Sequence, residues 1–279
     1  MATLKTPHGA LYYQAVDLTA PWVKAPETIL FHHGIGTNCE VYAGWMAPLV
    51  ERYRLVRFDV RGLGRSEKPG AGFRYSLDGL AADALAVADA VGAERFHVVG
   101  ESAGGTIALY LAARHPDRVL SMAGISFSHK GASIDHVTTW RKFVEANGMA
   151  AWSRQMMEQR FHPGAIAPAV RAWFEREQEA GDPAILLALA DMLIGADLSP
   201  LAAGIRAPVL MLVPDGSPFV SVRIAAELFS LLPNAEIQVF PHARHSLGLT
   251  HGAECAAALD RFIDRHRAAG AGFAAAAAQ

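Results

Sequence analysis

Cysteine is scarce in this chain, and long hydrophobic runs are missing. The 279 residues include 2 cysteines, Cys39 and Cys255, which lie far apart and form neither a metal-ligand spacing nor a dithiol motif. We expect both to be free thiols. Asp191 or glycines interrupt the longest apolar runs before they reach the length of a membrane span, and the first residues lack the apolar stretch of a secretory signal. The sequence therefore predicts a soluble, cytoplasmic protein.

The chain also lacks a surplus of charge. It has 25 lysines and arginines against 27 aspartates and glutamates, a formal net charge of -2. A protein that binds nucleic acid or an anionic membrane usually carries a basic excess or a basic patch. We therefore expect neither partner and consider a small neutral or mildly charged molecule the better ligand. We expect no cofactor and no metal. The sequence leaves open whether the protein forms a homodimer.

Apolar, β-branched runs alternate with helical stretches along most of the chain. This alternation predicts an α/β fold, with a mostly parallel sheet of about eight strands and helices on both faces. An antiparallel strand at residues 11–16 leads into the sheet. The other expected strands are residues 28–31, 55–60, 96–99, 119–127, 208–213 and 236–240, and helices are expected at residues 77–91, 106–113 and 224–232.

The alternation of strands and helices fails between the runs at residues 119–127 and 208–213. Residues 129–201 place large apolar side chains at helical spacings without a convincing strand. We interpret them as a helical cap inserted into a core made of residues 1–128 and 202–267. Residues 268–279 are almost all alanine and glycine, which predicts a flexible tail, either a frayed helix or disordered.

A serine flanked by glycines follows the run at residues 96–99. Residues 100–104 read Gly-Glu-Ser-Ala-Gly, between an expected strand and an expected helix. This arrangement is typical of a strand-turn-helix in which a strained serine projects its hydroxyl at the end of the sheet. Ser102 is therefore the candidate nucleophile. A chance match is the alternative, since the chain has 25 glycines, but the flanking strand and helix argue against it.

A nucleophilic serine needs a base and a third group that orients the base. Of the 12 histidines, His245 is best placed because it follows the last expected strand. Asp215, directly after the run at residues 208–213, is the candidate acid, although a surface aspartate in an ordinary turn is an alternative reading. The oxyanion of the tetrahedral intermediate needs two N–H donors, and we expect those of Ile35 and Ala103.

The chain resembles the cap-bearing α/β hydrolases over most of its length. His33 and Gly34 resemble the family's oxyanion loop, and residues 59–66 resemble a turn found in 3-oxoadipate enol-lactonases, cofactor-free haloperoxidases and small esterases. The resemblance implies the α/β-hydrolase fold, with Ser102 as nucleophile and His245 as base. We interpret the turn at residues 59–66 as structural.

One position departs from the family pattern. Family members often place the acid directly before a proline in the loop after the strand expected at residues 208–213, and here Ser217 precedes Pro218. Either the loop is reshaped so that Asp215 reaches the imidazole, or another carboxylate serves, or the triad is incomplete. The family's alternative location, near residue 127, offers serines and no acid.

These residues predict a serine hydrolase that cleaves a small or medium carboxylic ester or lactone. C–C bond hydrolysis of a diketone and perhydrolysis are alternatives with the same triad, and a receptor-like ligand-binding protein with feeble turnover is another. Aromatic residues and methionines of the cap favour an apolar pocket. The residues expected to contact substrate are Phe127, Trp140, Phe219 and Leu247.

Overall fold

A computed structural model describes residues 2–70 and 72–277, with side chains to residue 267. It contains an eight-stranded sheet in the order β1-β2-β4-β3-β5-β6-β7-β8, in which β1 and β2 are antiparallel to their neighbours and the other pairs are parallel. The strands are β1 Ala2–Thr6, β2 Gly9–Val16, β3 Thr28–His32, β4 Arg54–Phe58, β5 Phe96–Glu101, β6 Val119–Ile125, β7 Val209–Pro214 and β8 Ala235–Phe240. The predicted α/β fold is confirmed.

The central strands are continuous apolar runs because both of their faces are covered. Every residue of β3, β5 and β7 is buried, as expected for parallel strands between two layers of helices. Strand β1 was not predicted. It forms a hairpin with β2, whose turn is closed by the Thr6 hydroxyl donating to the Gly9 carbonyl at 2.6 Å.

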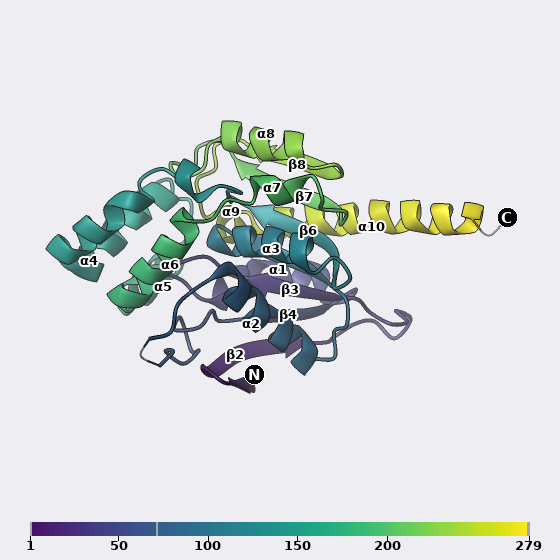
Figure 1. Ribbon diagram of the computed structural model, residues 1–279, viewed down its shortest axis with the longest axis horizontal. Coiled ribbons are helices and arrows are strands. Elements are labelled where there is room, and N and C mark those ends of the chain that lie inside the picture. The colour runs from purple at the N-terminus through teal and green to yellow at the C-terminus, as the bar shows by residue number, and fades with distance from the viewer. Residues whose placement is uncertain (1, 71, 278–279) are drawn as a thin grey trace.

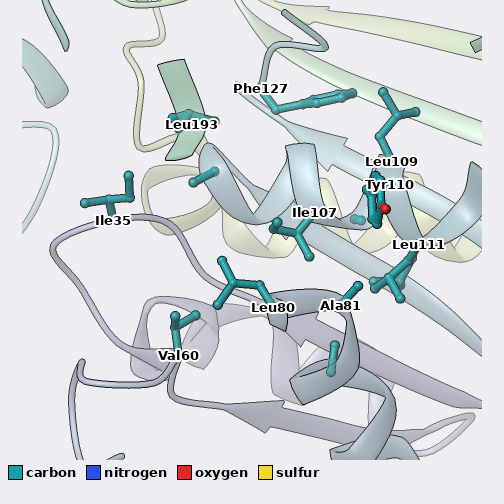
Figure 2. Close-up of a cluster of buried hydrophobic side chains, with 14 of the residues drawn as sticks. Ile35, Val60, Leu80, Ala81, Ile107, Leu109, Tyr110, Leu111, Phe127 and Leu193 are labelled. Carbon is teal, nitrogen blue, oxygen red and sulfur yellow. The ribbon is translucent and has the colours of Figure 1, made fainter. Parts of the chain in front are cut away.

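Helices cover both faces of the sheet (Figure 1). One buried cluster joins α2, α3 and α8 to the sheet, and a second joins α1 and α10 to it. Figure 2 shows the first cluster, with Leu80 and Ala81 of α2 beside Ile107 and Leu111 of α3. The core helices are α1 Ala43–Leu49, α2 Leu77–Ala90, α3 Ala103–Arg114, α7 Ser199–Ala202, α8 Val222–Leu231, α9 Leu247–Thr250 and α10 Gly252–Ala277, with a 3-10 turn η1 at Cys39–Tyr42.

Three helices between β6 and β7 gather at one end of the sheet, away from the projecting end of α10 (Figure 1). They are α4 Trp140–Arg160, α5 Pro168–Glu179 and α6 Pro183–Ile194, preceded by the 3-10 turns η2 Gly131–Ser133 and η3 Val137–Thr139. Gly148, at φ 76°, kinks α4. These helices occupy the region where the sequence indicates an inserted cap.

The C-terminal segment continues as helix. The backbone of α10 is helical to Ala277, so most of the expected tail at residues 268–279 has helical backbone, and its last two residues lie outside the described part of the chain. Among the helices of the described residues, none is long and apolar enough to cross a membrane.

The turn at residues 59–66 is held by buried polar contacts. The Arg61 guanidinium, 1% exposed, pairs with the Asp83 carboxylate, with Nε to Oδ2 at 3.0 Å. Asp59 accepts hydrogen bonds from the backbone N–H groups of Cys39 at 2.9 Å and Arg65 at 2.8 Å. These contacts join the turn to α2 and to the segment after β3, in keeping with a structural role.

Candidate active site

Ser102 stands in a strained turn between β5 and α3. Its backbone has φ 58° and ψ -124°, a region that L-residues rarely adopt. A Cβ atom added to Gly100 would lie 2.1 Å from the Gly104 carbonyl oxygen, and one added to Gly104 would lie 2.1 Å from the His32 carbonyl oxygen. Only glycine fits either position, so the flanking glycines allow the turn that exposes the Ser102 hydroxyl.

His245 lies over this hydroxyl. It follows β8 on the loop that leads to α9, and its Nε2 is 3.0 Å from Ser102 Oγ. The imidazole is 4% exposed. Burial, together with the positive charge of Arg160, holds the pKa of His245 well below its ordinary value. The ring is therefore neutral at neutral pH and, as the Nδ1–H tautomer, has a lone pair at Nε2 for a proton.

The structure does not bring Asp215 to His245, which corrects the expectation from the sequence. Asp215 is exposed, and its carboxylate accepts from the Ala243 backbone N–H at 3.3 Å. Ser217 takes the place beside the imidazole, with its Oγ 3.2 Å from Nδ1 of His245. The chain direction after β7 explains the difference, because the residue directly before Pro218 faces the histidine and the residue two positions earlier faces solvent.

Among the described residues, no carboxylate takes the position beside His245 Nδ1 that was expected for Asp215. At the end of β6, Ser126 is buried with φ 49°, and its hydroxyl has no hydrogen-bond partner. Glu101, next to the candidate nucleophile, accepts from the Gly248 backbone N–H at 3.0 Å and so links the elbow to the histidine loop. Burial raises the pKa of Glu101 to about 7. The imidazole thus has a hydroxyl partner where a carboxylate was expected.

The two expected oxyanion donors belong to residues close to Ser102, because Ala103 follows it in the chain and Ile35 lines the same pocket. Ala103 is the first residue of α3, so its N–H has no acceptor within the helix. Ile35 lies on the loop after β3, which His33 holds in place: Nδ1 of His33 lies 2.8 Å from the Gly34 carbonyl oxygen, and its Nε2 accepts from the Val60 N–H at 2.8 Å. Both candidate oxyanion donors therefore lie on rigid backbone.

A pocket opens over Ser102 and His245, and it is lined mostly by apolar side chains. Its volume is about 20 Å³, which is room for about one water molecule. Side chains or cap helices must therefore move apart to admit a substrate. The lining residues besides Ser102 and His245 are Ile35, Ser126, Phe127, Ser128, Ile134, Val137, Trp140, Arg160, Leu193, Phe219 and Val220. Figure 2 shows Ile35, Phe127 and Leu193.

Three of the four residues expected to contact substrate line this pocket: Phe127, Trp140 and Phe219. Leu247 does not, which corrects that prediction. It is fully buried in the cluster beneath α1 and α10, because the chain turns inward as α9 begins.

Sequence reasoning missed Arg160 in this pocket. Its position at the end of a helix resembles that of many exposed arginines, so only its place directly before Phe161 could have drawn attention to it.

The described residues contain no group of three or more His, Cys, Asp or Glu side chains placed to hold a metal ion. His32 and His33, adjacent in the sequence, are both buried, and burial lowers the pKa of each. Cys39 and Cys255 are free thiols, both buried.

Comparison with known proteins identifies the family. The model of the alpha/beta hydrolase fold matches residues 27–187. "Putative carbamate hydrolase RutD" of Caulobacter segnis is 28% identical over 262 residues, covering 87% of this chain and 93% of that protein. The 2-hydroxymuconate semialdehyde hydrolase of a Pseudomonas species is 29% identical over 250 residues, covering 84% of this chain and 86% of that protein.

Solved structures agree with this assignment. The enol-lactonase of Burkholderia xenovorans has a TM-score of 0.84 at 22% identity, covering 94% of this chain and 100% of that one. The bromoperoxidase of Bacillus anthracis has a TM-score of 0.81 at 18% identity, covering 92% and 96%. At these identities the likeness is one of fold. Together with the family match it shows that this chain belongs to the alpha/beta hydrolase family.

Proposed function

We propose that the protein is a serine hydrolase that cleaves a small or medium carboxylic ester or lactone through an acyl-enzyme intermediate. The observation that supports it most is the 3.0 Å contact between Ser102 Oγ and His245 Nε2 at a strained turn. Ser102 attacks the carbonyl carbon as His245 takes the hydroxyl proton. The N–H groups of Ile35 and Ala103 stabilise the oxyanion, and His245 then activates water to release the acyl group.

Ser217 determines how well His245 can act as the base. A carboxylate at Nδ1 fixes the tautomer that leaves Nε2 free to accept a proton, and it stabilises the imidazolium that forms. A hydroxyl can donate or accept, so it permits either tautomer. We therefore expect slower turnover than in a complete triad. The same observation favours a second candidate, a ligand-binding protein on this scaffold with feeble turnover.

A fluorophosphonate probe separates these functions. Labelling of Ser102 in the folded protein, lost in both Ser102→Ala and His245→Ala, is the expected result, together with hydrolysis of p-nitrophenyl esters or simple lactones. Labelling without turnover of any ester or lactone would favour C–C bond hydrolysis or the ligand-binding candidate. No labelling of the folded protein would contradict covalent catalysis.

A further inference from the structure

Arg160 is a buried cation at the end of α4. Its side chain is 5% exposed. Burial lowers its pKa to about 10, so the guanidinium stays charged near neutral pH. A charge in this environment is costly unless another group pairs with it.

The described part of the chain supplies no such partner. Nη2 of Arg160 donates to the Ile35 carbonyl oxygen at 3.3 Å, and Nε has no hydrogen-bond partner. The ring of Phe174 lies 5.6 Å from the guanidinium carbon. Glu101 acts on Arg160 only through its charge, without a hydrogen bond, and among the described residues no carboxylate oxygen lies within 4.0 Å of the guanidinium. The guanidinium therefore keeps unused donors.

Arg160 lines the pocket that contains Ser102 and His245. Two other lining residues carry buried polar atoms without a hydrogen-bond partner, the Ser126 hydroxyl and the Trp140 indole N–H. The pocket thus combines a guanidinium, an indole and a hydroxyl, all able to donate, within mostly apolar walls. A planar anion with two acceptor oxygens fits this set, since a guanidinium binds a carboxylate through two parallel hydrogen bonds.

We propose that Arg160 forms a carboxylate-binding subsite, so that the substrate carries a free carboxylate in addition to the ester or lactone bond that is cleaved. This inference rests on the proposed function and names its substrate class, the half-esters and lactones of short dicarboxylic acids. Ser126 and Trp140 are the further donors available to the same group.

The charge of Arg160 also connects this subsite to the chemistry. Together with burial, that charge lowers the pKa of His245, which opposes the imidazolium that forms when Ser102 loses its proton. A substrate carboxylate on Arg160 would neutralise the opposing charge. A substrate with the carboxylate should therefore bind more tightly and also react faster once bound.

The test compares p-nitrophenyl hydrogen adipate with its neutral methyl ester, which differ in the free carboxylate. We expect wild-type kcat/KM to be at least about 10-fold higher for the free acid, the value of a charge-assisted hydrogen bond. Arg160→Gln should bring this ratio to about 1, while Arg160→Lys should keep part of it. Arg154→Gln removes an exposed charge from the same helix and should leave the ratio unchanged. An equal loss for both esters in Arg160→Gln would overturn the proposal, because it would mean that Arg160 only supports the Ile35 loop.

A binding measurement tests the carboxylate subsite without requiring turnover. Ser102→Ala is titrated with the same two esters by calorimetry, alone and combined with Arg160→Gln. Tighter binding of the free acid that disappears in the double variant supports the subsite even if the wild-type protein hydrolyses neither ester, in which case the proposed function alone fails. Equal binding of the two esters by Ser102→Ala would refute the subsite whether or not esters are cleaved.

Discussion

Replacing Ser217 with aspartate should raise the activity of this protein. Three nitrogen atoms surround Ser217 Oγ: the ring nitrogen Nδ1 of His245 at 3.2 Å, and the donating backbone nitrogens of Phe219 at 3.3 Å and Val220 at 3.2 Å. A hydroxyl has two lone pairs and one proton. In the arrangement in which both backbone groups occupy the lone pairs, the hydroxyl proton points to Nδ1 and the ring proton lies on Nε2, a tautomer that cannot take the proton of Ser102. In the other arrangement Oγ accepts from Nδ1–H and Nε2 stays free, so only part of the protein is ready to react.

The geometry and the known strength of charge pairs give the expected size of the rise in activity. A carboxylate could accept from all three N–H groups and would place the ring proton on Nδ1. Unit charges about 4 Å apart attract by about 4 kcal/mol at an effective dielectric constant of about 20, and loss of the aspartate from a complete triad costs about 10⁴-fold in kcat. Partial burial of the new carboxylate offsets part of this gain. We therefore expect kcat/KM of Ser217→Asp to rise by about 10²-fold.

The assay is ester hydrolysis across a pH series. The new carboxylate favours the imidazolium, so the pKa of His245 should increase and the acidic limb of kcat/KM should move to higher pH. Ser230→Asp adds the same charge on an exposed part of α8 and should change neither quantity. A folded Ser217→Asp protein with unchanged or lower kcat/KM and an unmoved acidic limb would refute the reasoning about the tautomer.

Three further outcomes follow from the structure. Asp215→Asn should leave ester turnover within about 2-fold of wild type, because its carboxylate contacts backbone rather than the imidazole; a loss of several orders of magnitude would restore it as the triad acid. The pKa of Glu101 is raised to about 7 from an ordinary 4.5, so this residue contributes stability that is complete below about pH 4.5 and is lost as the pH rises through 7. Glu101→Gln, which keeps an oxygen for the Gly248 N–H, should therefore reduce the fall in unfolding free energy over this pH range by roughly 3 kcal/mol at most in denaturant titrations. An unchanged fall would show that Glu101 does not cause it. Arg61→Met leaves the Asp83 carboxylate unpaired and should lower the unfolding free energy by about 3 to 5 kcal/mol, with a change below about 1 kcal/mol contradicting the role of this ion pair.

The sequence predicted the parts of the site that local rules determine. The observed sharp turn at Ser102 requires the glycines that flank it, and a histidine after the last strand reaches the same end of the sheet because parallel strands end there together. The continuous apolar runs of β3, β5 and β7 marked the central sheet. Short elements such as β1 and α1 lacked a comparable signal, since their stability depends on pairing and packing with distant segments.

The rest depended on tertiary contacts that spacing does not encode. A shift of two positions in one loop decides whether Asp215 or Ser217 faces His245, and both readings fit the same residues. Leu247 follows the catalytic loop in sequence, yet the start of α9 directs it into the core. Arg160 carries the charge typical of a helix surface, and its burial results from the packing of α4 against the Ile35 loop.

The account depends most on covalent catalysis by Ser102 with proton transfer to His245. The most direct measurement is the intact mass of the protein after rapid acid quenching during turnover of a p-nitrophenyl ester, followed by peptide mapping of the modified residue. We predict an acyl adduct on Ser102 that is absent in His245→Ala. Hydrolysis that proceeds in Ser102→Ala at the wild-type rate, or an adduct at another residue, would contradict the account.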